Sequence, residues 1–148
     1  MTREALNRQI GHLHDEILLL GSMVEQAMLD VMEALKNRDK KSARQIFDND
    51  QVINEKRFAI ENAVLILIAT QQPIAHDLRI LTAMLEIINE RERMGDYAKG
   101  IAKVIVMLGD TDITIPVREL NEMATLGVDM LHRALGAFVE ENPNQASA

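Results

Sequence analysis

Residues 67–81, LIATQQPIAHDLRIL, decide the fold because they hold the proline that separates two long segments with periodic apolar residues. The residue before a proline is driven out of the helical region, whereas proline itself suits the first turn of a helix. We therefore predict that one helix stops before Pro73 and that Gln71-Gln72-Pro73 forms a tight turn. Pro73 should then lie in the first turn of an antiparallel helix.

The segment before this turn predicts two helices. Apolar residues from Leu6 to Leu35 recur at intervals of three or four residues, which is typical of one buried face on a long, coiled-coil-like helix. Residues 37–39 interrupt the pattern, and Asp39 is a good N-cap for the next helix. That second helix continues to the turn at Pro73.

The segment after the turn predicts two more helices. The third runs to about Leu108 and has two apolar faces, so we expect it to contact neighbours on both sides. Residues 109–112 form a turn cluster, Pro116 begins a shorter helix, and the polar residues 140–145 are expected to fray. The predicted fold is all-α, an antiparallel three-helix bundle with an additional C-terminal helix.

Composition narrows the classes of function. The 148 residues are 47% apolar, enough for a core, and the absence of cysteine excludes disulfides and thiolate metal sites. A net charge of -7 without a basic stripe argues against nucleic-acid binding. The first four residues do not resemble a secretion signal, and the longest apolar run, residues 63–69, is too short to span a membrane. We expect a soluble, cytoplasmic protein.

Two carboxylates in the third helix are the strongest candidates for a site. Glu92 and Asp96 are four residues apart and thus stand one turn apart on one helix face. Leu85 and Ile88 lead toward Glu92 at the spacing of a buried seam, so we expect this face to be buried. Buried acids must be paired, protonated or bound to metal. Gly95 between them costs roughly 1 kcal/mol relative to alanine, which suggests a close approach there.

A second polar pair is predicted at the same height. Asp50 and Asp96 are each 23 residues from Pro73, and Asn54 and Glu92 are each 19 residues from it. Since antiparallel helices rise equally per residue, these four oxygen-bearing side chains should lie at one level of the bundle. Such a set suits Mg²⁺, Ca²⁺, Mn²⁺ or iron. The alternative is that the acids pair with arginines such as those at 57, 91 and 93, or lie at a solvated edge.

Other candidates are weaker. Asp129 and His132 are similar to the Glu-x-x-His pair of di-iron bundles, but the chain has one copy and an Asp in place of the Glu. His12 and His14 are two residues apart and face different sides of a helix. No serine or threonine lies in a recognisable nucleophile setting.

Two elements together carry a family resemblance. The first is Gln72-Pro73-Ile74-Ala75-His76-Asp77-Leu78-Arg79, and the second, about 13 residues later, is Glu92-Arg93-Met94-Gly95-Asp96. With Asp50-x-x-x-Asn54 on the preceding helix, the chain resembles the PhoU family of phosphate-uptake regulators. Two positions depart from the family pattern: Arg91 stands where an apolar residue is usual, and Asn54 is a weaker ligand than aspartate.

The resemblance implies an organisation and a site. Residues 1–108 resemble a complete PhoU-like three-helix repeat, 109–115 a linker, and 116–148 the first helix of an incomplete second repeat. Glu92, Asp96, Asp50 and Asn54 then correspond to the family's metal motif, with Mn, Fe, Mg or Zn as the ion. Because the lone fourth helix would leave an apolar face uncovered, we expect a homodimer or higher oligomer.

The function implied is that of a non-enzymatic regulator of phosphate uptake and phosphate-responsive signalling. It would contact a phosphate ABC transporter complex and a sensor histidine kinase, and reach the membrane only through these proteins. One alternative is a metal-free helical adaptor or oligomerisation module. Another is a carboxylate di-metal oxidase, which would require histidine partners that the chain lacks at the predicted level.

Overall fold

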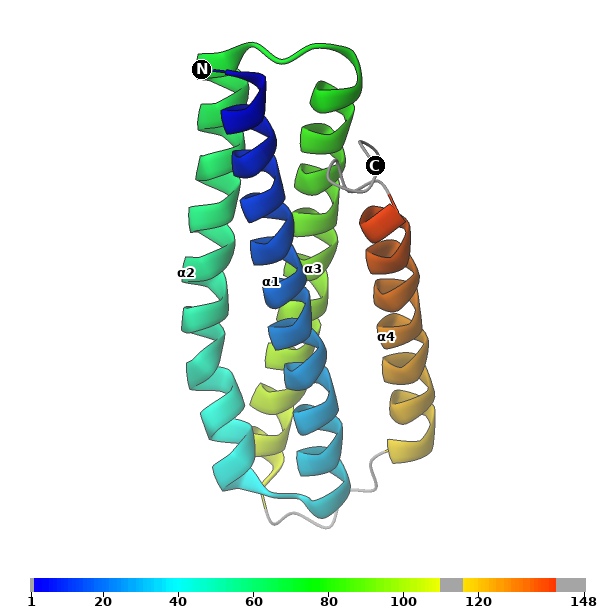
Figure 1. Cartoon of the computed structure of the whole chain (residues 1–148). Helices are drawn as coiled ribbons and strands as arrows, with labels where there is room; N and C mark the ends of the chain where they lie inside the picture. Colours follow the sequence, from blue (N-terminus) through cyan, green and yellow to red (C-terminus); the bar gives the residue numbers. More distant parts are fainter. Residues whose placement is uncertain (1, 110–115, 141–148) are drawn as a thin grey trace.

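The protein is a bundle of long helices. A computed structural model describes residues 2–109 and 116–140, without the side chains of 131, 134, 135 and 137–140. Its helices are α1 (Arg3–Asn37), α2 (Lys40–Gln71), α3 (Ala75–Leu108) and α4 (Val117–Glu140), and the described residues form no strand. Successive helices run in opposite directions (Figure 1). The predicted all-α bundle with an additional C-terminal helix is therefore confirmed.

The ends of α1 and α2 follow local capping rules. The side chain of Thr2 accepts a hydrogen bond from the backbone N–H of Ala5 at the start of α1. Arg38 adopts the left-handed conformation that ends α1, and the carboxylate of Asp39 then accepts from the N–H of Ser42. The predicted N-cap at Asp39 is confirmed, because a short acidic side chain satisfies an N–H that the first helical turn leaves unpaired.

At the turn around Pro73, the predicted end of α2 is right and the predicted start of α3 is wrong. As predicted, α2 ends before the proline, with Gln72 in the left-handed conformation. However, α3 begins at Ala75 with Ile74 as an extended N-cap, so Pro73 lies before the helix and is buried in the turn. The left-handed Gln72 reverses the chain, and two further residues carry it across to the axis of α3.

The core fills the space between α1, α2 and α3 along their whole length. Fully buried side chains include Ile17 and Leu20 of α1, Val64 of α2, and Leu81 and Ile88 of α3. The predicted seam on α3 is only partly right. Leu78, which lies seven residues before Leu85 on the same helical line, is 39% exposed. Beyond Ile88 the buried face passes through Arg91, Gly95 and Ala98 rather than through Glu92 and Asp96.

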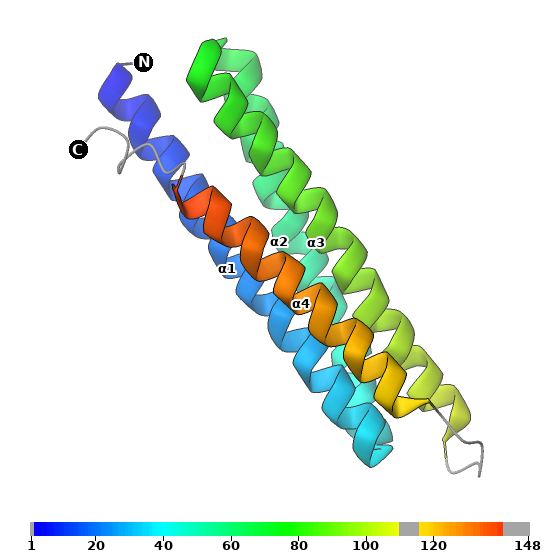
Figure 2. The same ribbon diagram turned by 90° about the vertical axis from the view of Figure 1, so that its right-hand side faces the viewer.

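Helix α4 lies along the side of the bundle formed by α1 and α3 (Figure 2). Ala124 is buried there, and His132 Nε2 lies 2.8 Å from Glu25 Oε1 on α1. The opposite face of α4 exposes Met123, Leu126 and Met130. The turn residues from Asp110 and the polar end from residue 141 fall outside the described residues. No described helix combines the length and apolar character that a membrane crossing requires.

Candidate functional site

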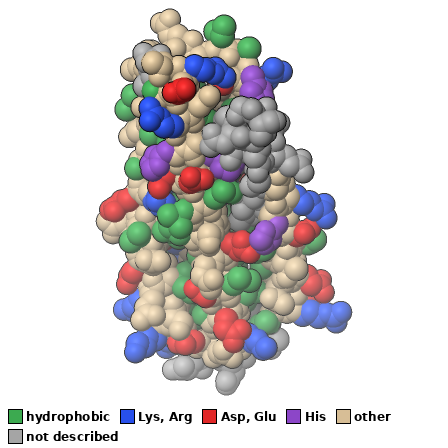
Figure 3. Space-filling model, viewed as in Figure 1, with side chains coloured by type: hydrophobic (Ala, Val, Ile, Leu, Met, Phe, Trp, Pro, Cys, Tyr) green, Lys and Arg blue, Asp and Glu red, His purple; other side chains and the backbone are tan. Residues whose placement is uncertain are grey.

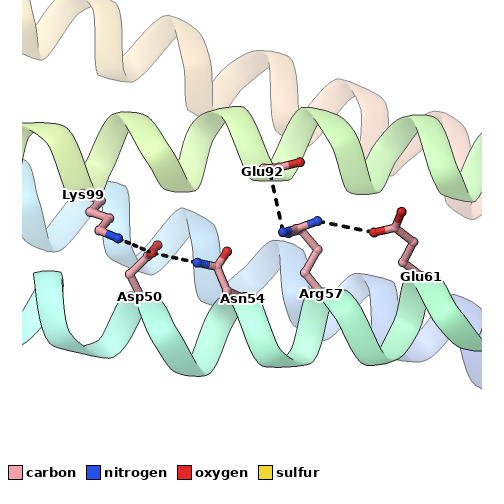
Figure 4. Close-up of polar contacts among 6 residues, drawn as sticks. All are labelled: Asp50, Asn54, Arg57, Glu61, Glu92 and Lys99. Carbon is pink, nitrogen blue, oxygen red and sulfur yellow. Dashed lines mark hydrogen bonds and ion pairs between the residues drawn. The ribbon is translucent and has the colours of Figure 1, made fainter.

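The predicted polar level between α2 and α3 exists. A Cβ built on Gly95 of α3 would lie 3.8 Å from Asp50 Oδ1 of α2. Figure 4 shows Asp50, Asn54 and Arg57 on α2 facing Glu92 and Lys99 on α3. The height match across the turn is therefore right. The height of a residue along the bundle does not determine how its helix is rotated about its axis.

Asp50 is the buried carboxylate at this level. Only 5% of the residue is exposed, and Asn54 Nδ2 donates a hydrogen bond of 3.0 Å to its Oδ2. Lys99 Nζ lies 3.5 Å from the same oxygen and also 5.0 Å from the centre of the Phe47 ring. Asp50 and Asn54 thus lie together as predicted, and the counter-ion of Asp50 is Lys99, which sequence reasoning did not identify.

Glu92 takes part in an ion-pair cluster. Its carboxylate lies 3.5 Å from Arg57 Nη2, and Arg57 Nη1 lies 3.4 Å from Glu61 Oε2. The guanidinium of Arg57 also stacks over Phe58, 4.2 Å from the ring centre. Arg57 is only 8% exposed, whereas the Glu92 side chain is 42% exposed. The arginine pairing considered as an alternative is thus what the structure has at Glu92.

The prediction that Glu92 and Asp96 lie on one buried face of α3 is wrong at Asp96. The residue is exposed and makes no hydrogen bond or ion pair with any residue in the described ranges. The reason is geometric: Gly95 is the residue that faces α2, and the next residue is rotated by about 100° toward solvent. The contact distance at Gly95 is ordinary, so the expected close approach there does not exclude a side chain.

The four predicted metal ligands fit a cation only in part. Asp50 and Asn54 supply oxygens side by side, but no three His, Cys, Asp or Glu side chains gather at metal-binding range among the described residues. A hard cation takes about six or more oxygens, several of them from water. For Asp50 and Glu92 to share an ion, Lys99 and Arg57 would have to move away. Metal binding by this set stays a prediction.

The other candidate ligands do not combine. Asp129 pairs with Arg133 at 2.9 Å, while His132 lies against Glu25 of α1. His12 is exposed and His14 is buried, as their spacing predicted. The Asp129-x-x-His132 pattern therefore belongs to two separate contacts on the surface of α4.

Arg91 is an unusual buried charge, which the sequence marks both as a possible partner for the acids and as a departure from the PhoU family pattern. It is 1% exposed, and burial lowers its pKa to about 10. Nη1 donates a 3.3 Å hydrogen bond to the carbonyl of Ile87, whereas Nε and Nη2 have no hydrogen-bond partner in the described part of the chain. A Cβ on Gly21 of α1 would lie 2.6 Å from Nη2. Between α1 and α3, the close approach is at Gly21 rather than at Gly95.

A signal for this contact was present in the sequence. Arg91 lies three residues after Ile88 and four before Gly95, so it continues the apolar line of α3, and it stands where the PhoU pattern usually has an apolar residue. Gly21 lies inside the long periodic segment of α1. Neither residue by itself shows that the two meet, because they belong to different helices.

Comparisons with known proteins agree with the resemblance seen in the motifs. Residues 17–105 match the PhoU domain. Over 147 residues the chain is 39% identical to the phosphate-specific transport system accessory protein PhoU homolog of Clostridium acetobutylicum, covering 99% of this chain and 67% of that protein. The PhoU homolog of Streptococcus pneumoniae strain TIGR4 is 32% identical over 136 residues, covering 92% of this chain and 63% of that protein.

Solved structures give the same picture for the fold. The crystal structure of the phosphate transport system regulatory protein PhoU from Streptococcus pneumoniae has a TM-score of 0.78 at 30% identity, covering 89% of this chain and 62% of that one. PhoU from Pseudomonas aeruginosa has a TM-score of 0.82 at 26% identity, covering 90% of this chain and 65% of that one. The chain spans about two thirds of the length of these proteins.

Proposed function

Because this chain belongs to the PhoU family, we propose that it is an accessory regulator of phosphate transport and phosphate-responsive signalling. The observation that carries the proposal is the 39% identity, over nearly the whole chain, to a protein named as a phosphate-specific transport system accessory protein. The partners proposed are a phosphate ABC transporter complex and a sensor histidine kinase. Contact with them would occur at the cytoplasmic face of the membrane, without insertion into it.

The polar residues between α2 and α3 support a role through contacts rather than catalysis. Asp50 is held by Asn54 and Lys99, and Glu92 by Arg57, so the charges there are neutralised in pairs. Relatives are named as accessory or regulatory proteins.

Genetic complementation tests the regulatory role. In a strain that lacks its own PhoU, phosphate-starvation genes are expected to be expressed at high external phosphate, and expression of this chain should repress them. The chain should also co-purify with tagged transporter or kinase. A Leu20→Asp variant, which places a charge in the core, serves as the unfolded control. Failure of the folded wild-type chain both to repress and to co-purify contradicts the proposal.

We also propose that Asp50, Asn54, Glu92 and Asp96 bind a metal ion, with Mn, Fe, Mg or Zn as candidates. The support is the buried Asp50 carboxylate, whose cationic partner Lys99 is 40% exposed and can leave. Lys99 and a metal would then compete for one carboxylate. A metal that binds only the folded state raises its stability according to its concentration and affinity.

Added metal is expected to raise the melting temperature of the wild-type protein but not of Asp50→Asn. Asp48→Asn removes an exposed acid from the same helix and is the matched control. Lys99→Gln should bind metal more tightly than the wild type. Elemental analysis of protein purified without chelators supplies the ion's identity. An equal response of Asp50→Asn and Asp48→Asn, or no response, leaves the metal-free adaptor as the better description.

The same preparation tests the proposed homodimer or higher oligomer. The exposed stripe of Met123, Leu126 and Met130 on α4 is the surface that a second subunit would cover. Light scattering at micromolar concentration is expected to give at least twice the monomer mass, and Leu126→Glu should lower it. A monomer in the wild-type sample contradicts this proposal and leaves the regulatory one standing.

A further inference from the structure

An open groove lies between α1 and α2 near the end of the bundle that carries the turn at Pro73. It has a volume of about 690 Å³. Its lining is mostly apolar or small, with four polar side chains among nine residues: Ala5, Arg8, Gln9, His12, Leu13, Ala63, Ile66, Leu67 and Thr70. Nothing described above uses this groove, since α4 packs on α1 and α3 instead (Figures 1 and 2).

The shape of the groove suits a helix. Leu13 and Leu67 form its buried floor, at 6% and 5% exposure. On one wall of the groove, Ala63 has a small side chain that leaves space, and Ile66 beside it is 61% exposed. A groove with a floor of leucines and a wall of small residues allows another helix to approach closely and to insert apolar side chains. The two helices of the groove would thereby gain a further neighbour on this side.

An ion pair joins α1 and α2 beyond the lining of the groove. Lys56 Nζ donates a 2.6 Å hydrogen bond to Glu16 Oε2, which joins α2 to α1 and lowers the pKa of Glu16. Lys56 lies two turns before Ala63 on α2, and Glu16 lies one turn after His12 on α1. On α2 the lining runs from Ala63 to Thr70, roughly 11 Å at the helical rise per residue. It accommodates a helical segment of about two turns.

The charged side chains that line the groove indicate what kind of partner it would bind. Although the chain has 23 acidic and 16 basic residues, the lining contains no acid and has Arg8 and His12 one turn apart on α1. Arg8 is exposed and forms no ion pair with any residue of the described ranges. Figure 3 shows this part of the surface, where basic, histidine and hydrophobic side chains lie together with acidic ones that are outside the lining. An acidic partner is complementary to it.

We propose that this groove binds an amphipathic helix of another protein, with acidic residues on the side that faces α1. Apolar residues of the partner, spaced by three or four, pack on Leu13, Ala63 and Ile66. Its carboxylates pair with Arg8 and His12. The proposal goes beyond the role in phosphate transport, because it names the contact surface and the chemistry of the segment that fills it, and it can fail or succeed separately.

Two designed peptides of about 18 residues test the groove, one with leucines at helical spacing flanked by glutamates and one with lysines in place of the glutamates. Fluorescence anisotropy with the full chain is expected to show the glutamate peptide binding at least about tenfold more tightly, and losing affinity with added salt. Arg8→Glu should reverse the preference. In the wild type, backbone amide shifts of Ala5, Ala63 and Thr70 should move on binding.

Matched variants locate the contact. Ile66→Asp is expected to weaken binding at least about tenfold, because it puts a charge on the apolar wall. Leu65→Asp, at the adjacent exposed position outside the lining, should leave binding unchanged. Circular dichroism checks that both variants are folded.

Four results overturn the proposal: equal affinity for both peptides, no binding up to about millimolar peptide, equal losses in the two variants, or amide shifts elsewhere. A change of mass in light scattering for Ile66→Asp would instead assign the groove to a second copy of this chain and would also overturn it. Binding of the wild type to anionic lipid vesicles, without binding of the glutamate peptide, would assign it to a membrane surface.

Discussion

Arg91→Met is expected to raise the free energy of unfolding by about 1–4 kcal/mol, the range found when buried ion pairs are replaced by apolar residues of similar volume. The guanidinium is 1% exposed and has one weak hydrogen bond and no acidic partner among the described residues. Burying such a charge opposes folding. Urea unfolding at neutral pH measures the gain, and a loss of stability would show that Arg91 has a compensating partner.

The pH dependence of this gain follows from the sign of the pKa shift. Burial lowers the pKa of Arg91 to about 10 in the folded state, below its ordinary value. A group whose pKa is lowered because its charged form is buried destabilises the folded state fully below the folded pKa. The gain from Arg91→Met should therefore be equal at about pH 6 and about pH 8, and should decrease only when the pH rises through about 10.

Gly21→Ala provides the control for the same contact. In the wild type, the new Cβ would lie 2.6 Å from Arg91 Nη2, so the guanidinium must move, and this cost opposes the roughly 1 kcal/mol that alanine gains over glycine in a helix. In the Arg91→Met background the thioether side chain can adapt, so the same change should cost less. A double-mutant cycle is expected to give a coupling energy of at least about 0.5 kcal/mol. Independent effects would show that the two residues do not touch.

Leu20→Ala is expected to lower the free energy of unfolding by about 2–5 kcal/mol. Leu20 of α1 is fully buried in the core cluster between α1, α2 and α3. The neighbouring Leu19 is 50% exposed and offers the same substitution on the same helix. Leu19→Ala should cost less than about 0.5 kcal/mol, as is usual for surface positions.

Chemical denaturation of the two leucine variants side by side tests the rotation of α1 in the bundle. Similar losses in both would mean that α1 is rotated from the orientation described, or that Leu19 is covered in solution by another subunit. Light scattering of the Leu19→Ala variant separates these two explanations.

Much of the fold could be predicted because its signals are local. Asp39 was identified as an N-cap and is one, since its side chain needs only the next helical turn. Pro73 was expected to end α2, and the helix ends before it because proline restricts the residue that precedes it. The start of α3 was misplaced by two residues, since nothing in the local sequence showed that Ile74 would be the extended cap.

The sequence predicted the height of the candidate site along the bundle, but not which charged residues pair there. Counting residues from Pro73 brought Asp50 to the height of Asp96, and the structure has Asp50 in contact range of the adjacent Gly95. The same counting could not tell that Asp96 would face solvent while Asp50 is buried. The height of a residue depends on the rise per residue alone, whereas the side of the helix on which its side chain lies depends on how the helix is rotated about its axis.

By itself, the sequence determined the number of helices, their antiparallel order and the family, because helical periodicity, caps and motifs are properties of neighbouring residues. Only the tertiary structure decided which charges meet: Lys99 with Asp50, Arg57 with Glu92, and Arg91 with the bare backbone at Gly21. Each helix packs on at least two others at once, so its rotation is set by all these contacts together. The rotation of α2 and α3 buries Asp50 and leaves Asp96 exposed to solvent.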